Sequence, residues 1–211
     1  MSKAVNLGVI GAGSAVFSLA LIRDLCLQDS LRGSAVTFMD RDPDRLDMIH
    51  RLATRYAREL GVDLKFEKTL DRSVALQDAD FVVNTAARGH AAEEAERAVA
   101  EKHGYYRGLR IGSPQHNLDL MLSVARDMEA TCPNAWLIQS GNPVFDGCTL
   151  MTRETSLKIV GLCHGHYGYR RIAQVLDLDP DQVTCLAPGL NHCIFAQHLE
   201  FQGQNLYPRL D

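Results

Sequence analysis

The chain has 211 residues, of which 46% are hydrophobic and 23% are charged, with 16 glycines and 7 prolines. This is the composition of an ordinary globular protein, and a chain of this length can bury a sizeable core without disulfide or metal support. The formal net charge of -4 excludes the strongly basic surface that nucleic-acid-binding domains carry.

Cysteine usage points to a reducing compartment. The six cysteines are scattered along the chain and form no Cys-x-x-Cys pair, so a disulfide scaffold is not indicated. Residues 4–22 carry no charge, but three glycines interrupt them and no signal-peptide cleavage pattern follows. We therefore expect a cytoplasmic protein with no membrane segment and no nucleic-acid partner.

The chain opens with a strand, a glycine turn and a helix. Residues 3–10 form a short apolar run, and residues 14–28 have apolar side chains at helical spacing. A second strand is predicted over 34–40, and a second helix over 42–61 with Asp42 as its N-cap. This order predicts a parallel strand pair joined by a helix.

The alternation continues to residue 163. Further strands are predicted over 62–69, 78–86, 134–140 and 156–163, and further helices over 91–104, 114–132 and 142–155. Parallel strands with helical crossovers build an α/β, Rossmann-like, doubly wound sheet. After residue 163 a helix at 167–178 precedes strand-like segments over 181–211. We expect a nucleotide-binding domain over 1–165 and the truncated start of an α+β catalytic domain over 166–211.

The glycine turn after the first strand indicates a dinucleotide site. Gly11 permits a tight turn, and Gly13 lets a pyrophosphate approach the backbone where Ser14 begins a helix. Val16 stands where the third glycine of this fingerprint is usual, so the motif by itself is incomplete.

The end of the second strand completes the cofactor prediction. Asp40 stands where an acidic residue hydrogen-bonds the ribose hydroxyls of NAD, whereas the neighbouring Arg41 leaves NADP open. Thr85, after the fourth strand, is assigned to the same site. The alternative is a structural glycine turn with a surface aspartate.

Other strand ends of the same sheet edge supply polar residues. Arg88 has the donor fork that suits a substrate carboxylate or a pair of hydroxyls, and its alternative is an exposed loop arginine. Asn142 suits a sugar hydroxyl or an amide, and it is equally placed to cap the next helix.

A Cys-His pair and a later Asn-His pair leave three interpretations open. Cys163 and His192 at two strand ends suit a catalytic divalent metal with open coordination positions. A closed zinc site from Cys163, His166, His192 and Cys193 has suitable ligands but unusual spacing. A buried cysteine and a core histidine with no metal form the third interpretation.

Six segments together resemble the family 4 glycoside hydrolases, which are NAD- and Mn-dependent glycosidases related in fold to lactate and malate dehydrogenases. The segments are GAGSAVF, DRDPDRLDMI, NTAARG, SGNPVFDG, GLCHGHYG and GLNH, in this order along almost the whole chain. The Cys-His segment followed by Gly-Leu-Asn-His is the most specific part, and it favours the metal interpretation.

The resemblance implies a role for each matching residue. It implies that Gly11, Gly13, Ser14 and Asp40 hold NAD, and that Arg88 and Asn142 contact the sugar. It further implies that Cys163 and His192 bind Mn²⁺ or another divalent metal, with His164 as candidate acid. The Cys-His-Gly sequence is similar to that of members acting on α-linked uronic acids.

The implied activity is hydrolysis of α-glycosides, with α-D-uronides as the first candidate, by oxidation, elimination, addition and reduction. Family members are about twice as long, so we expect the catalytic base to lie beyond Asp211 and the 211-residue chain to be inactive alone. The implied partner is a small carbohydrate, and a homo-oligomer is usual for such enzymes. A malate-type 2-hydroxy-acid dehydrogenase and a non-catalytic NAD-binding module are the alternatives.

Overall fold

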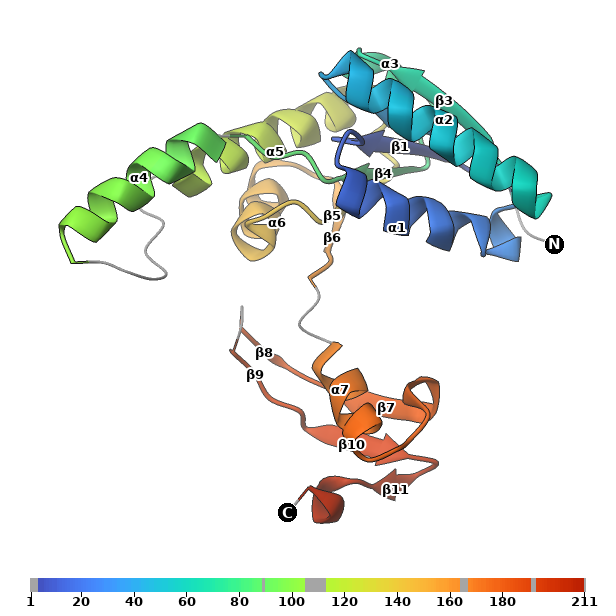
Figure 1. The fold of residues 1–211 in the computed structure, drawn as a ribbon. Helices are drawn as coiled ribbons and strands as arrows, with labels where there is room; N and C mark the ends of the chain where they lie inside the picture. The colour runs from blue at the N-terminus through green and yellow to red at the C-terminus, as the bar shows by residue number, and fades with distance from the viewer. Residues whose placement is uncertain (1–3, 89, 105–112, 164–166, 191–192, 211) are drawn as a thin grey trace. The chain divides into compact units, whose positions relative to one another are not determined.

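The predicted alternation of strands and helices is present, and it builds a six-stranded parallel sheet with helices on both faces (Figure 1). The structure is a computed structural model, and it describes residues 4–88, 90–104, 113–163, 167–190 and 193–210. These residues fall into two units, Met1–Leu162 and Cys163–Asp211. The Rossmann-like fold class is thereby confirmed for the first unit.

The sheet has the strand order β3-β2-β1-β4-β5-β6. Its strands are β1 (Asn6–Ile10), β2 (Ala35–Met39), β3 (Lys65–Thr69), β4 (Phe81–Asn84), β5 (Trp136–Gln139) and β6 (Lys158–Gly161). The order reverses between β1 and β4. In open α/β sheets a ligand binds in the crevice beside the carboxyl ends of the strands at such a point.

Helices pack on both faces of the sheet because successive side chains of a strand point to opposite faces. The helices of this unit are α1 (Ala15–Cys26), α2 (Pro43–Leu60), α3 (Arg72–Leu76), α4 (His90–Lys102), α5 (Ser113–Thr131) and α6 (Val144–Glu154). Helices α1 and α2 share a buried core with β1 and β2 around Val9 and Phe38. Helices α3, α5 and α6 share a second core around Leu76, Met121 and Leu137.

The sequence signals that bound α2 are confirmed, whereas α3 was missed. The Asp42 carboxylate accepts hydrogen bonds from the backbone N–H groups of Asp44 and Arg45, and the donor–acceptor distance is 3.1 Å in each. Gly61 ends the helix in the left-handed region at φ 63°. The five residues of α3 are too few to show a helical period, and the segment begins at the N-cap Asp71.

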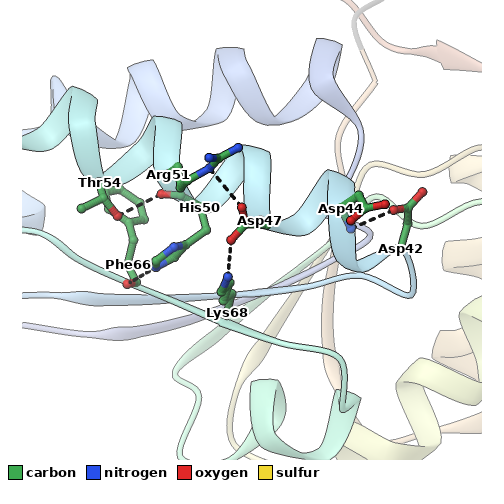
Figure 2. Close-up of polar contacts among 8 residues, drawn as sticks. All are labelled: Asp42, Asp44, Asp47, His50, Arg51, Thr54, Phe66 and Lys68. Carbon is green, nitrogen blue, oxygen red and sulfur yellow. Dashed lines mark hydrogen bonds and ion pairs between the residues drawn. The ribbon is translucent and has the colours of Figure 1, made fainter.

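Polar contacts join α2 to the edge strand β3 (Figure 2). Lys68 Nζ donates to Asp47 Oδ1 over 2.5 Å, and Arg51 pairs with the other oxygen of the same carboxylate over 3.0 Å. His50 Nε2 lies 2.9 Å from the carbonyl oxygen of Phe66. The hydrogen bond from Lys68 lowers the pKa of Asp47.

The second unit has its own small core. It consists of α7 (Gly168–Val175), the antiparallel strands β7 (Val183–Leu186), β10 (His198–Phe201) and β11 (Gln204–Asn205), and the pair β8 (Gly189–Leu190) and β9 (Cys193–Ile194). Its buried residues are Ala173, Val183, Leu199 and Leu206. Short 3-10 helices lie at Pro180–Gln182 and Tyr207–Arg209 in this unit, and at Asp29–Leu31 in the first unit. None of the helices in the described ranges is long and apolar enough to cross a bilayer.

Candidate functional site

The glycine turn is hydrogen-bonded to the end of the neighbouring strand β2. The N–H groups of Gly11 and Ala12 both donate to the carbonyl oxygen of Met39, over 2.9 and 3.0 Å. Gly11 has φ 86°, and a Cβ added there would lie 2.5 Å from the backbone N and Cα of Ala86. Only glycine fits this position, because a side chain would collide with the loop that follows β4.

Gly13 and Asp40 are in direct contact. The Gly13 N–H donates to Asp40 Oδ2 over 2.7 Å, and the Asp42 N–H donates to Asp40 Oδ1 over 3.0 Å. A Cβ on Gly13 would lie 2.7 Å from the carboxyl carbon of Asp40. The turn and the acidic residue that were predicted separately therefore meet at one place.

Helix α1 begins at this turn, and its N-cap residue makes no side-chain capping hydrogen bond. The N-cap residue is Ser14, and the first turn of the helix carries no acidic residue. Ser18 Oγ donates to the carbonyl oxygen of Ala12 over 2.6 Å, which ties the turn to the helix. Val16 is 88% exposed, so the residue in place of the third glycine does not pack between helix and sheet. The N–H groups at such a helix start favour an anion.

The loop after β4 lies against the same turn. Thr85 Oγ1 donates to the carbonyl oxygens of Ile10 and Gly11, over 3.1 and 3.0 Å. Arg88 is exposed, and its backbone N–H donates to Asn117 Oδ1 over 2.7 Å. Thr85 thus holds the end of β1, while the Arg88 side chain remains available for a ligand.

A cavity of about 890 Å³ brings all five predicted cofactor residues together. Its lining includes Gly11, Gly13, Ser14, Asp40, Thr85 and Arg88. Pockets for small molecules and cofactors commonly have volumes of about 300 to 1,000 Å³. The structure therefore groups five predicted cofactor residues and one predicted substrate residue around one space.

The cavity has a positive lining. Among the described residues that line it, four are arginines and one, Asp40, is acidic; the arginines are Arg41, Arg45, Arg72 and Arg88. Arg45 pairs with Asp42 over 3.2 Å, and Arg72 pairs with Asp127. An excess of guanidinium groups favours an anionic ligand such as a dinucleotide.

Asn142 does not line this cavity. It is exposed and precedes a cis peptide bond to Pro143, which is the N-cap residue of α6. The interpretation of Asn142 as a helix cap is therefore wrong, and its role toward a sugar stays a prediction.

Two of the four predicted metal residues, His166 and His192, lie outside the described part of the chain, as does the candidate acid His164. The other two are described: Cys163 is half-buried at the start of the second unit, and Cys193 is exposed. Within the ranges that the structure describes, no three His, Cys, Asp or Glu side chains are grouped as a metal site. Both metal interpretations therefore stay predictions.

Two buried amides at the ends of β4 and β5 were not assigned a role. Asn84 and Gln139 have 0% exposed surface, and they hydrogen-bond each other. Neither residue is among the site residues predicted from the sequence. The available signal was a polar residue at the last position of each apolar strand.

The sequence model described as "Family 4 glycosyl hydrolase" matches residues 6–178 of the chain. A 6-phospho-beta-glucosidase of Escherichia coli strain K12 is 30% identical over an alignment that covers 100% of this chain and 49% of that protein. An alpha-galactosidase of Bacillus subtilis strain 168 is 27% identical over 95% of this chain and 49% of its own length. This chain spans about half the length of the curated relatives it matches.

The fold is similar to that of a solved 6-phospho-alpha-glucosidase from gut microorganisms, whose crystal structure is in complex with NAD and Mn²⁺. The TM-score is 0.86 at 20% sequence identity, covering 98% of this chain and 50% of that one. At this identity the similarity bears on the fold alone.

Proposed function

This chain belongs to family 4 of the glycosyl hydrolases, and we propose that it carries the cofactor and metal residues of an NAD-dependent glycosidase. The observation that carries this proposal is the cavity in which the Gly11 turn, the Gly13 backbone and the Asp40 carboxylate meet. We assign the first unit to cofactor binding and the second to a catalytic domain.

The residues of the cavity fit a dinucleotide. At Gly13 the Asp40 carboxylate occupies the space that a Cβ would fill, so the absence of a side chain lets the turn and the acidic residue meet. The open N–H groups at the start of α1 suit a pyrophosphate. Both Asp40 oxygens accept backbone hydrogen bonds, which fixes the carboxylate so that its remaining lone pairs can accept from ribose hydroxyls.

The donor set proposed for the metal is the Cys163 thiolate with the His192 imidazole. Both donor types bind divalent transition metals, and Mn²⁺ is the weakest binder of the first-row series. We therefore expect a weakly held, exchangeable ion. The similar 6-phospho-alpha-glucosidase structure is in complex with Mn²⁺. Two protein ligands leave coordination positions for substrate oxygens.

When bound, NAD supplies a reversible hydride acceptor, and a divalent metal supplies a Lewis acid for sugar oxygens. The chain's own residues bind and orient the sugar. Arg88 presents its guanidinium group at the cavity and donates to a carboxylate or a hydroxyl pair. Asn142 donates to a sugar hydroxyl, and His164 holds or moves a proton at the glycosidic oxygen.

We propose an α-linked uronide as the substrate. The Cys163-His164-Gly165 sequence and the guanidinium of Arg88 support this choice, because a planar carboxylate matches the arginine fork. The curated relatives quoted above act on 6-phospho-beta-glucosides and alpha-galactosides, so a sugar phosphate and a neutral sugar are the competing substrates.

Calorimetry on the protein loaded with NADH and Mn²⁺ tests the proposal. We expect galacturonate to bind more tightly than galactose or glucose 6-phosphate, and EDTA to abolish the binding. Tighter binding of glucose 6-phosphate would contradict the uronide. Binding of malate that resists EDTA would favour a dehydrogenase, and NADH binding without metal or sugar binding would favour a nucleotide-binding module.

A further inference from the structure

Two buried side-chain amides connect the carboxyl ends of β4 and β5. Asn84 and Gln139 occupy paired positions of these parallel strands, and each is the last residue of its strand. Asn84 Nδ2 donates to Gln139 Oε1 over 2.9 Å. Both side chains are fully buried, so water does not satisfy the rest of their polar atoms.

The remaining polar atoms of the pair bind the two loops that follow. The Ala86 N–H donates to Asn84 Oδ1 over 3.2 Å, and Gln139 Nε2 donates to the carbonyl oxygen of Gly141 over 2.8 Å. The N–H groups of Ser140 and Gly141 donate to the backbone oxygen of Asn84, and the N···O distance is 3.0 Å in each bond. The pair therefore forms a chain of hydrogen bonds from one loop to the other.

The two loops also touch directly, and the first of them touches the glycine turn. A Cβ on Gly141 would lie 3.0 Å from the carbonyl oxygen of Ala86 and 3.2 Å from Gln139 Nε2. Ala86 in turn fills the space beside Gly11. A displacement of the Gln139 side chain can therefore move Asn84 and, through it, Ala86 beside the lining of the cavity.

Stability alone does not explain two amides at these positions. A buried polar group costs free energy unless it is hydrogen-bonded, and apolar side chains would pack between β4 and β5 without that cost. Apolar side chains cannot, however, bind the Ala86 N–H or the Gly141 carbonyl. The directional bonds to the loops are what the amides add.

We propose that Asn84 and Gln139 are positioning residues that set the loop carrying Arg88, which forms the substrate end of the cavity, and the neighbouring loop carrying Asn142. The Asp40 end is anchored separately by its bonds to Gly13 and Asp42. Disturbing the amide pair therefore impairs the substrate end and leaves the Asp40 end intact. The ligand part of this inference rests on the proposed function.

Amide hydrogen exchange on the ligand-free chain tests the positioning itself. Gln139→Met keeps the side-chain length but removes both amide groups, and Asn84→Leu keeps the branching. We expect Gln139→Met to speed exchange at Ala86, whose N–H bonds to Asn84 and not to Gln139, by about tenfold or more. We expect Asn84→Leu to speed amide exchange at Gly141 in the same way. Neither variant should change the exchange rate at Gly13.

Two further variants separate positioning from general destabilisation. Ser34→Ala removes a buried hydroxyl, which accepts from the Val5 N–H at the opposite end of the sheet, and it should leave exchange at Ala86 and Gly141 unchanged. The exchanged pair Asn84→Gln with Gln139→Asn keeps both amides and should restore most of the protection. Unchanged exchange at Ala86 and Gly141 in both single variants would overturn the inference, as would an exchanged pair that fails to restore it.

Ligand titrations then test the division of the cavity. In the single variants we expect at least fivefold weaker NADH binding with ADP binding unchanged. The nicotinamide half of NADH must extend toward the substrate end to exchange hydride, whereas ADP reaches only the Asp40 end and the glycine turn. Equal losses for both ligands would overturn the inference. If the unaltered chain binds neither ligand, the proposed cofactor function fails, and the exchange experiment still decides the positioning role.

Discussion

The backbone N–H of Gly13 and the carboxylate of Asp40 are joined by a hydrogen bond of 2.7 Å, although 27 residues separate them in the chain. This bond links the turn after β1 to the end of β2, the two places at which the sequence predicts contacts with a dinucleotide. Because a side chain on Gly13 would displace the carboxylate, each residue depends on the other.

Substituting Gly13→Ala should weaken NADH binding by about tenfold or more. The added Cβ would lie 2.7 Å from the carboxyl carbon of Asp40, so the carboxylate must move and the hydrogen bond is lost. Fluorescence titration with NADH measures the effect. Gly168→Ala is the matched control, because a Cβ there meets nothing within 4 Å and should leave the affinity unchanged. Equal affinities of Gly13→Ala and the unaltered chain would contradict this account.

Substituting Asp40→Asn should reduce the preference for NADH over NADPH. The amide has one acceptor oxygen for two backbone donors, so NADH binds about tenfold more weakly, while the repulsion of a 2′-phosphate disappears. Parallel titrations with NADH and NADPH measure the ratio of dissociation constants. Asp44→Asn removes a nearby exposed charge and should leave that ratio unaltered. A ratio that stays the same in Asp40→Asn would show that Asp40 does not select the cofactor.

The sequence predicted the sheet and the glycine turn because both depend on short-range patterns. Apolar strands, the glycine turn and the Asp42 cap are each visible within a few residues. The Asn84–Gln139 pair was missed because its partners are 55 positions apart and meet only through strand pairing. Helix α3 was missed because five residues carry no period, and Asn142 was misjudged because Pro143 takes the capping position.

The metal interpretations differ in what they predict for two cysteines. If Cys163 and His192 form the metal pair, Cys163→Ser should weaken Mn²⁺ binding by about tenfold or more, while Cys193→Ser leaves it unchanged. A closed zinc site predicts losses in both variants. Competition with a fluorescent metal indicator distinguishes them. Cys185→Ser serves as the control, because burial raises the pKa of that thiol and disfavours the thiolate. Unaltered metal binding in Cys163→Ser would contradict both interpretations.

The contact between Asp47 and Lys68 predicts a pH dependence of stability. The hydrogen bond from Lys68 holds the pKa of Asp47 below the ordinary value of 3.8, so the folded state favours the charged carboxylate. This contribution is present above about pH 4 and is lost as the pH falls through the lowered pKa. Urea unfolding between pH 2 and pH 7 measures it.

The Asp47→Asn variant provides the control for this effect. It should be less stable than the unaltered chain at pH 7 and equally stable at the acid end of the range. A difference in stability that stays constant with pH would contradict the contribution assigned to the Asp47–Lys68 contact.

The most direct test of the central claim is a titration of the folded 211-residue chain with NADH, followed by its fluorescence. The cavity around Gly13 and Asp40 predicts saturable binding at one site per chain, competed by ADP and weakened in Gly13→Ala. A chain that is folded by circular dichroism and shows no binding at millimolar NADH would contradict the assignment of this cavity to the cofactor.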